Sequence, residues 1–122
     1  MNKDIRILVC DDSILARKNL TTILNSFGYT DISEVSNGED AVNFCKEHKP
    51  DLIFLDIVMP VKDGVTATSE IMEADPDARI VIVSSVGTQT HIKEAIKAGA
   101  KDFIQKPIDE ELLKQILENL NG

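Results

Sequence analysis

The sequence predicts an α/β fold in which five parallel strands alternate with five helices. Two observations lead to this prediction. Short apolar runs alternate with longer amphipathic stretches along the 122 residues. Several of the runs are apolar almost throughout, which is typical of strands buried on both faces in a parallel sheet. Because parallel crossovers are right-handed, helices fall on both faces and the fold is doubly wound.

Five runs have the length and composition of strands. They span residues 5–10, 32–36, 52–55, 79–84 and 103–105. The second run is the weakest, because polar residues interrupt its apolar ones. The first, third and fourth carry long series of branched aliphatic residues, which favour strands.

The stretches between these runs have helical spacing of apolar residues. They cover residues 13–27, a short segment around 41–45, 64–74, 90–98 and 109–120. Gly28 and Gly99 follow the first and fourth of them, where glycine commonly ends a helix. Asp109 opens the last helix, and Gly87 and Thr88 are expected in the loop after the fourth strand.

Composition excludes several classes of protein. The chain has 21 acidic and 13 basic residues, for a net charge of −8, and no cluster of lysine and arginine, which argues against nucleic-acid binding. No apolar run reaches membrane-spanning length. Cys10 and Cys45 form no metal-binding or disulfide pattern, so we expect a reduced, cytoplasmic protein without a membrane-inserted segment. The ten elements fill residues 1–122, and we expect a single domain without an output domain.

Polar residues stand where the predicted strands end. Asp11 and Asp12 follow the first strand, Asp56 follows the third, Ser84 ends the fourth and Lys106 follows the fifth. Ligand sites of open parallel sheets lie beyond the carboxyl ends of the strands. These side chains are therefore expected to converge on one edge of the sheet.

Three converging carboxylates need a compensating charge. Two like charges about 4 Å apart repel by about 4 kcal/mol at an effective dielectric constant near 20. Three such pairs approach the stability of a small domain, about 5–15 kcal/mol. One lysine cannot offset this, whereas Mg²⁺ binds carboxylates, water and phosphate oxygens. A carboxylate beside such a cation and a lysine is a suitable nucleophile towards phosphorus.

This arrangement resembles the receiver domain of bacterial two-component response regulators. The matching segments are Asp11-Asp12, residues 56–60 with Gly64, Ser84 and residues 103–107. The resemblance covers nearly the whole chain and implies the strand order 2-1-3-4-5. Residues 94–104 further resemble stand-alone chemotaxis regulators of the CheY type.

The resemblance implies a metal site around a phospho-acceptor. Asp56 would accept the phosphoryl group and bind Mg²⁺. Asp12 would bind the metal directly and Asp11 through water. The backbone carbonyl of Val58 would complete the protein ligands.

The resemblance also implies a switch. Lys106 would pair with the phosphoryl oxygens, the Ser84 hydroxyl would move towards them, and Phe103 would fill the vacated space. The face formed by the fourth helix, fifth strand and fifth helix would then change its partner binding. Simpler interpretations stay open: Asp11 and Asp12 suit a helix cap, Lys106 a surface position, and Phe103 the core.

Partners follow from the same resemblance. A sensor histidine kinase would donate the phosphoryl group, and a flagellar-motor switch protein would receive the signal. We expect a monomer, with phosphorylation-dependent dimerisation as an option. A single-domain phosphorelay intermediate and a receiver cut from a longer transcriptional regulator are alternatives within the signalling class.

Two alternatives come from other classes. An aspartyl-phosphate phosphatase of the haloacid dehalogenase type would need a second aspartate at position 58, where this chain has valine. A flavodoxin-like electron carrier would need a phosphate-binding loop after the first strand, where Asp11 and Asp12 would repel the phosphate. Only the receiver accounts for all of the strand-end residues.

Val58 and Val86 lie two residues beyond the expected acceptor and switch hydroxyl, at positions that flank the attacking water in the family. Two branched apolar side chains should hinder that water. We predict that the wild type dephosphorylates itself more slowly than the Val58→Asn/Val86→Asn double variant. Phosphoryl loss followed by intact-mass measurement checks this, and equal or faster hydrolysis in the wild type would refute it.

Overall fold

The computed structural model describes residues 3–85 and 89–121, and confirms five strands alternating with five helices. The strands are β1 (Ile7–Cys10), β2 (Ile32–Val35), β3 (Leu52–Asp56), β4 (Ile80–Ser84) and β5 (Asp102–Gln105). The helices are α1 (Ile14–Ser26), α2 (Gly38–His48), α3 (Gly64–Ala74), α4 (Gln89–Ala98) and α5 (Glu110–Asn121). The expectations for Val86, Gly87 and Thr88 lie outside the described residues.

The strands form one parallel sheet in the order β2-β1-β3-β4-β5, as predicted. Cys10, the last residue of β1, lies opposite Leu55 of β3. The residues that follow, Asp11 and Asp56, therefore leave the sheet side by side. Asp56 is itself opposite Val83 of β4.

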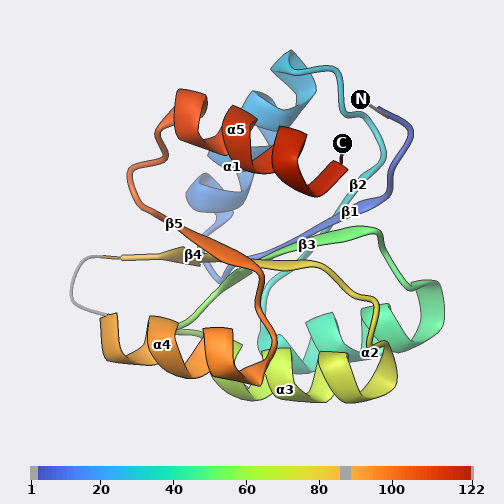
Figure 1. Ribbon diagram of the computed structural model, residues 1–122, viewed down its shortest axis with the longest axis vertical. Coiled ribbons are helices and arrows are strands. Elements are labelled where there is room, and N and C mark those ends of the chain that lie inside the picture. The colour runs from blue at the N-terminus through green and yellow to red at the C-terminus, as the bar shows by residue number, and fades with distance from the viewer. Residues whose placement is uncertain (1–2, 86–88, 122) are drawn as a thin grey trace.

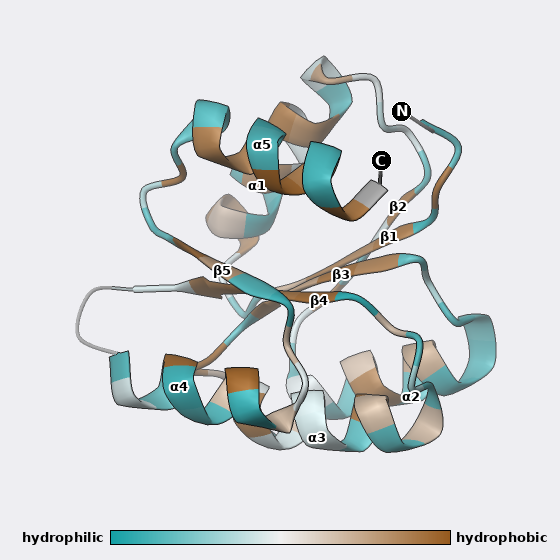
Figure 2. Cartoon of the chain, in the orientation of Figure 1, coloured by the Kyte–Doolittle hydropathy of each residue, from teal (hydrophilic) through white to brown (hydrophobic). Residues whose placement is uncertain are grey.

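Helices cover both faces of the sheet (Figure 1). Helices α1 and α5 lie on one face, and α2, α3 and α4 lie on the other. Each face has its own apolar core, and alternate strand residues serve the two: Val9 and Phe54 pack on the α1 and α5 side, and Leu8 and Ile53 on the opposite side. Figure 2 shows the apolar strands between helices whose outer surfaces are largely polar. No described helix has the length and apolarity needed to cross a bilayer.

Side-chain hydrogen bonds set several element boundaries. The backbone N–H of Arg6 donates to the side-chain carboxylate of Asp51 (2.9 Å) and not to a backbone carbonyl of a neighbouring strand. Strand β1 accordingly begins at Ile7 rather than at residue 5. Ser13 caps α1 by accepting a hydrogen bond from the N–H of Ala16 at 3.2 Å. The predicted boundaries of the other elements differ from the observed ones by a few residues at most, apart from α2, which is longer than expected.

Helix α5 buries one apolar face and leaves Leu112 outside it. Leu113, Ile116 and Leu117 are buried against the sheet, whereas Leu112 is 42% exposed. Leu113, Ile116 and Leu117 follow the i, i+3, i+4 spacing of one helical face, and Leu112, which points about 100° away from Leu113, falls outside that face.

Gly64 allows α3 to begin directly against the end of β3. Its N–H donates to the carbonyl of Ile57 at 2.8 Å. A Cβ atom at position 64 would lie only 2.2 Å from the carbonyl oxygen of Asp56 and 2.8 Å from the Cα of Ile57. Both neighbours are backbone atoms, which cannot rotate away.

We predict that Gly64→Ala lowers the free energy of unfolding by about 1–3 kcal/mol, as overpacking does. In an unobstructed helix the same change would stabilise the protein slightly. Chemical denaturation measures the difference, and Ser69→Ala at an exposed position of α3 is the matched control. An alanine variant as stable as the wild type would contradict the close approach.

Candidate acceptor and metal site

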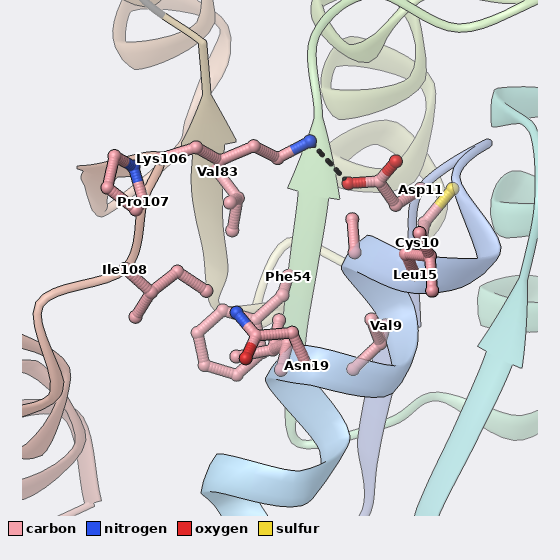
Figure 3. A pocket seen from close by; sticks show the side chains of 12 residues that line it. Val9, Cys10, Asp11, Leu15, Asn19, Phe54, Val83, Lys106, Pro107 and Ile108 are labelled. Atoms are coloured by element: carbon pink, nitrogen blue, oxygen red, sulfur yellow. Dashed lines mark hydrogen bonds and ion pairs between the residues drawn. The ribbon is translucent and has the colours of Figure 1, made fainter.

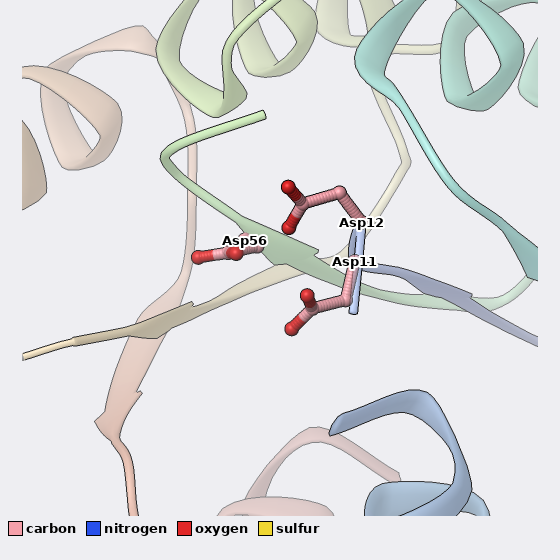
Figure 4. A group of neighbouring side chains, drawn as sticks. All are labelled: Asp11, Asp12 and Asp56. Atoms are coloured by element: carbon pink, nitrogen blue, oxygen red, sulfur yellow. The ribbon is translucent and has the colours of Figure 1, made fainter. Parts of the chain in front are cut away.

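Three carboxylates meet at the carboxyl end of the sheet, as predicted (Figure 4). Asp11 and Asp12 come from the segment after β1, and Asp56 is the last residue of β3. One oxygen from each lies within 4.8 Å of the others. Asp11 and Asp56 are buried, and Asp12 is exposed. The group therefore has a buried base and one side open to solvent.

Lys106 brings a positive charge to this cluster. Its Nζ lies 2.7 Å from Oδ2 of Asp11 and 3.5 Å from Oδ2 of Asp56. Figure 3 shows the side chain reaching from the segment after β5 to Asp11. The Lys106–Pro107 peptide bond is cis. The structure thus assigns Lys106 to the site and not to the general surface.

The pKa of Asp56 is raised to about 6. Burial is the main cause, and the negative charge of Asp11 adds to it. Lys106 and the hydrogen bond from the N–H of Ile57 (2.8 Å) act in the opposite direction without cancelling the rise. The charge of Lys106 therefore does not offset the cost of burying the ionised carboxylate of Asp56.

Lys106 keeps its proton in this setting. Burial alone would lower the pKa of its ammonium group. The hydrogen bond to Asp11 and the charge of Asp56 outweigh burial and raise the pKa above its ordinary value. The site therefore holds three carboxylates and one cationic side chain.

Ser84 contributes a hydroxyl without a partner. The side chain is completely buried, and its Oγ makes no hydrogen bond within the part of the chain that the structure describes. Leaving a buried hydroxyl unpaired costs about 1–3 kcal/mol. Its backbone is tied to Lys106, whose N–H donates to the Ser84 carbonyl at 2.7 Å.

Arg17 holds the backbone of Asp11, a role that the sequence did not reveal. Its Nη1 donates to the carbonyl of Asp11 at 2.6 Å, and its Nε pairs with Glu34 at 3.1 Å. The N–H of Ser13 donates to Oδ1 of Asp11 at 2.9 Å. Ser13, rather than Asp11 or Asp12, is therefore the cap of α1, and Asp11 supports the turn while bonding Lys106.

Two other predicted residues lie at the periphery. Val58 is 65% exposed in the loop after Asp56. Phe103 is 43% exposed on β5, an edge strand, so the alternative that it belongs to the core does not hold.

The two cysteines are free thiols buried in the core. Burial is the main reason that the pKa of Cys10 is raised to about 12, and the same holds for Cys45. Cys10 Sγ lies 3.3 Å from Sδ of Met59 and 3.3 Å from the carbonyl of Asn37. Cys10 therefore packs as a small, protonated core residue beside the site.

An apolar cavity of about 240 Å³ lies beneath the Lys106–Asp11 pair (Figure 3). Its walls come from β1, α1, β3, β4 and residues 106–108, with Val9, Phe54 and Ile108 among the lining residues. The pair thus has apolar side chains beside it and is partly shielded from water, which strengthens its electrostatic interaction compared with a fully exposed pair.

The donor set fits a hard divalent cation. All three groups are carboxylates, two of them buried, and such oxygens are the ligands that Mg²⁺ and Ca²⁺ take in proteins. The buried thiols lie outside the group, which argues against a soft metal. The acidic cluster is therefore able to bind a metal ion.

Comparison with known proteins agrees with this geometry. The sequence profile of the response regulator receiver domain matches residues 7–118. The chemotaxis protein CheY of Thermotoga maritima is 44% identical, over 95% of this chain and 94% of its own. CheY of Bacillus subtilis is also 44% identical, over 95% of this chain and 98% of its own.

Solved structures show the same fold. CheY in a CheX–CheY–BeF₃–Mg²⁺ complex from Borrelia burgdorferi has a TM-score of 0.85 and 38% identity, covering 94% of this chain and 88% of that one. The receiver domain of a sensor histidine kinase from Pseudomonas aeruginosa has a TM-score of 0.87 and 26% identity, covering 98% of this chain and 99% of that one. That structure has a magnesium ion coordinated in its active-site cleft.

The raised pKa of Asp56 predicts a pH-dependent cost in stability. A carboxyl group whose pKa is higher in the folded state destabilises the protein above that pKa, and the cost disappears as the pH falls below the unfolded value of 3.8. A rise to about 6 corresponds to about 3 kcal/mol at about 1.36 kcal/mol per unit. Without metal, Asp56→Asn should be more stable by this amount at pH 7.5 and by about half at pH 5.

Denaturant titration in chelating buffer measures both differences. Asp77→Asn, at an exposed position remote in sequence from the site, is the matched control and should change little at either pH. An Asp56→Asn variant that is less stable, or whose gain does not depend on pH, would contradict the electrostatic origin of the cost.

Proposed function

The chain belongs to the response regulator receiver family, and on that premise we propose that Asp56 is its phospho-acceptor. The chain is a phospho-acceptor module of a two-component system, with a histidine kinase as donor and a downstream protein as target. The assignment to Asp56 rests on this chain's own geometry.

One observation carries the assignment. Asp56 ends β3 within 4.8 Å of the carboxylates of Asp11 and Asp12, and the ammonium of Lys106 lies 3.5 Å from Asp56 and 2.7 Å from Asp11. A phosphoryl group transferred to Asp56 would therefore lie near both Lys106 and a cation held by the carboxylates. Charge on the incoming oxygens would thus be met from both directions.

The metal proposed for the site is Mg²⁺. Asp12 and Asp56 would bind it directly, Asp11 through water, and the backbone carbonyl of Val58 would be the further protein ligand. When bound, Mg²⁺ supplies positive charge that neutralises the carboxylates and the phosphoryl oxygens. The charge count of the site, with one lysine against three carboxylates, supports this requirement.

The proposed transfer is a direct displacement. A carboxylate oxygen of Asp56 attacks the phosphorus, and the bond from phosphorus to the donor histidine nitrogen breaks with its electron pair returning to the imidazole. The product is an acyl phosphate on Asp56. Lys106, which keeps its proton, pairs with the new phosphoryl oxygens. Water later hydrolyses the acyl phosphate, so the chain catalyses only its own phosphorylation and dephosphorylation.

Ser84 and Phe103 are proposed to carry the response. The unpaired hydroxyl of Ser84 gains a hydrogen-bond acceptor when a phosphoryl group arrives, which favours its inward movement. Phe103 is proposed to fill the space that Ser84 leaves. The affected face carries one partly exposed large apolar side chain on each element: Ile96 on α4, Phe103 on β5 and Leu112 on α5. Such side chains suit a protein-binding surface.

We propose that the pathway is chemotaxis and that the target is a flagellar-motor switch protein. Relatives named CheY, which match nearly the full length of this chain, support the pathway. A monomeric, single receiver domain over residues 1–122 is proposed with it, in the cytoplasm, where free thiols such as Cys10 and Cys45 persist.

Small-molecule phosphorylation tests the acceptor. With acetyl phosphate and Mg²⁺, the wild type should gain one phosphoryl group that base and hydroxylamine remove, visible as a single mass increment. Asp56→Asn should gain none, and Asp77→Asn should behave as the wild type. Labelling that persists in Asp56→Asn would overturn the assignment, and sustained hydrolysis of phosphomonoesters would indicate a phosphatase instead.

Binding assays then test the pathway. Capture of a motor switch protein by the phosphorylated form alone would support chemotaxis. Onward transfer of the phosphoryl group to a histidine of another protein would indicate a phosphorelay intermediate and refute the motor target.

A further inference from the structure

Lys62 joins two helices to the loop that follows Asp56. Its Nζ lies 2.9 Å from Oε2 of Glu39, in the first turn of α2, and 2.7 Å from Oε1 of Glu70 on α3. The lysine side chain is only 17% exposed, so both contacts are partly shielded from water. The loop, residues 57–63, is thus fixed at its distal end by a three-residue ion cluster.

The backbone at Lys62 is held as closely as its side chain. A Cβ atom at Gly38 would lie 2.2 Å from the carbonyl oxygen of Lys62, so the start of α2 packs directly on this peptide. The neighbouring Val61 has a φ of 69°, a region that branched residues rarely adopt. Surrounding contacts therefore hold the loop in a conformation that its own residues do not favour.

Two further contacts hold the proximal part of the same loop. The N–H of Gly64 bonds the carbonyl of Ile57, and Sδ of Met59 contacts Sγ of Cys10. Val58 lies in sequence between Ile57 and Met59, which make these contacts. Its side chain is exposed, so its backbone is held through these neighbours. The position of the Val58 carbonyl therefore depends on how firmly the loop is anchored at both ends.

We propose that Lys62 is a positioning residue that sets the affinity of the acceptor site for Mg²⁺, by holding the loop so that the Val58 carbonyl faces the carboxylates. The inference rests on the proposed function, in which that carbonyl is a metal ligand. Lys62 does not touch the reacting atoms and acts only through the loop. The pKa of Lys62 is raised by its hydrogen bonds to Glu70 and Glu39, so the cluster stays charged at neutral pH.

Magnesium titration of the purified protein, followed by calorimetry or by NMR shifts, tests the inference directly. Lys62→Met removes the charge and keeps the length of the side chain. We expect its Kd for Mg²⁺ to rise about tenfold, at the lower end of losses seen when groups that orient metal ligands are removed. Lys62→Arg keeps the charge and should restore most of the affinity.

Phosphorylation by acetyl phosphate provides a second readout. Lys62→Met should need more Mg²⁺ for half-maximal rate, while the rate at saturating Mg²⁺ stays near that of the wild type. A general loss of structure would lower the saturated rate instead. Lys46→Met, an exposed lysine on the same helix as Glu39, is the matched control and should change neither value.

In Lys62→Met, Glu39 and Glu70 are left to repel each other, and this repulsion could itself move the loop. A triple variant distinguishes that effect from the loss of the Lys62 contacts. Lys62→Met/Glu39→Gln/Glu70→Gln has no unpaired carboxylate and should still bind Mg²⁺ weakly; recovery of wild-type affinity would overturn the inference. If Lys62→Met does not fold, Glu70→Gln removes one arm of the cluster and should raise the Kd by a smaller factor. Unchanged affinity in the folded single variants overturns the inference, whereas a wild type that does not bind Mg²⁺ overturns the proposed function and this inference with it.

Discussion

The repulsion among three carboxylates at one end of the sheet is the constraint on which the remaining features of the site depend. Asp11, Asp12 and Asp56 lie within 4.8 Å of one another, and a single ammonium, from Lys106, faces them. Burial raises the pKa of Asp56, the negative charge of Asp11 adds to the rise, and Lys106 does not cancel it. The site is therefore unstable in itself and responsive to added cations, which is a useful property for a switch.

The same end of the sheet also holds an unsatisfied hydroxyl. Ser84 is buried, its hydroxyl has no hydrogen-bond partner among residues 3–85 and 89–121, and its carbonyl is bonded to the N–H of Lys106. Two uncompensated groups, one carboxyl and one hydroxyl, thus stand on neighbouring strands, β3 and β4. In the proposed function, a phosphoryl group and its cation would supply partners for both groups, which would favour the proposed shift in the packing of β4 and β5.

Rigid surroundings make this charge arrangement possible. Arg17 holds the backbone of Asp11, Gly64 brings α3 against Asp56, and Lys62 ties the loop between them to Glu39 and Glu70. Carboxylates on flexible segments would separate and lower their repulsion. Backbone anchors on both sides of the cluster prevent that, so the cost remains in the folded state until a ligand arrives.

The sequence by itself determined the fold class, the strand order implied by the resemblance, and the convergence of Asp11, Asp12, Asp56 and Lys106. These follow from local patterns, because apolar runs define the strands and parallel strands end at one edge. Their functional roles, and those of Ser84, Val58 and Phe103, stay predictions.

Only the tertiary structure decided how the site is held. Arg17 and Lys62 look like ordinary surface cations in the sequence, and their partners Glu34, Glu39 and Glu70 lie between 8 and 23 residues away on other elements. The exposure of Leu112 likewise depends on which side of α5 meets the sheet. Contacts of this kind depend on the packing of neighbouring elements, which a periodic pattern along the chain does not contain.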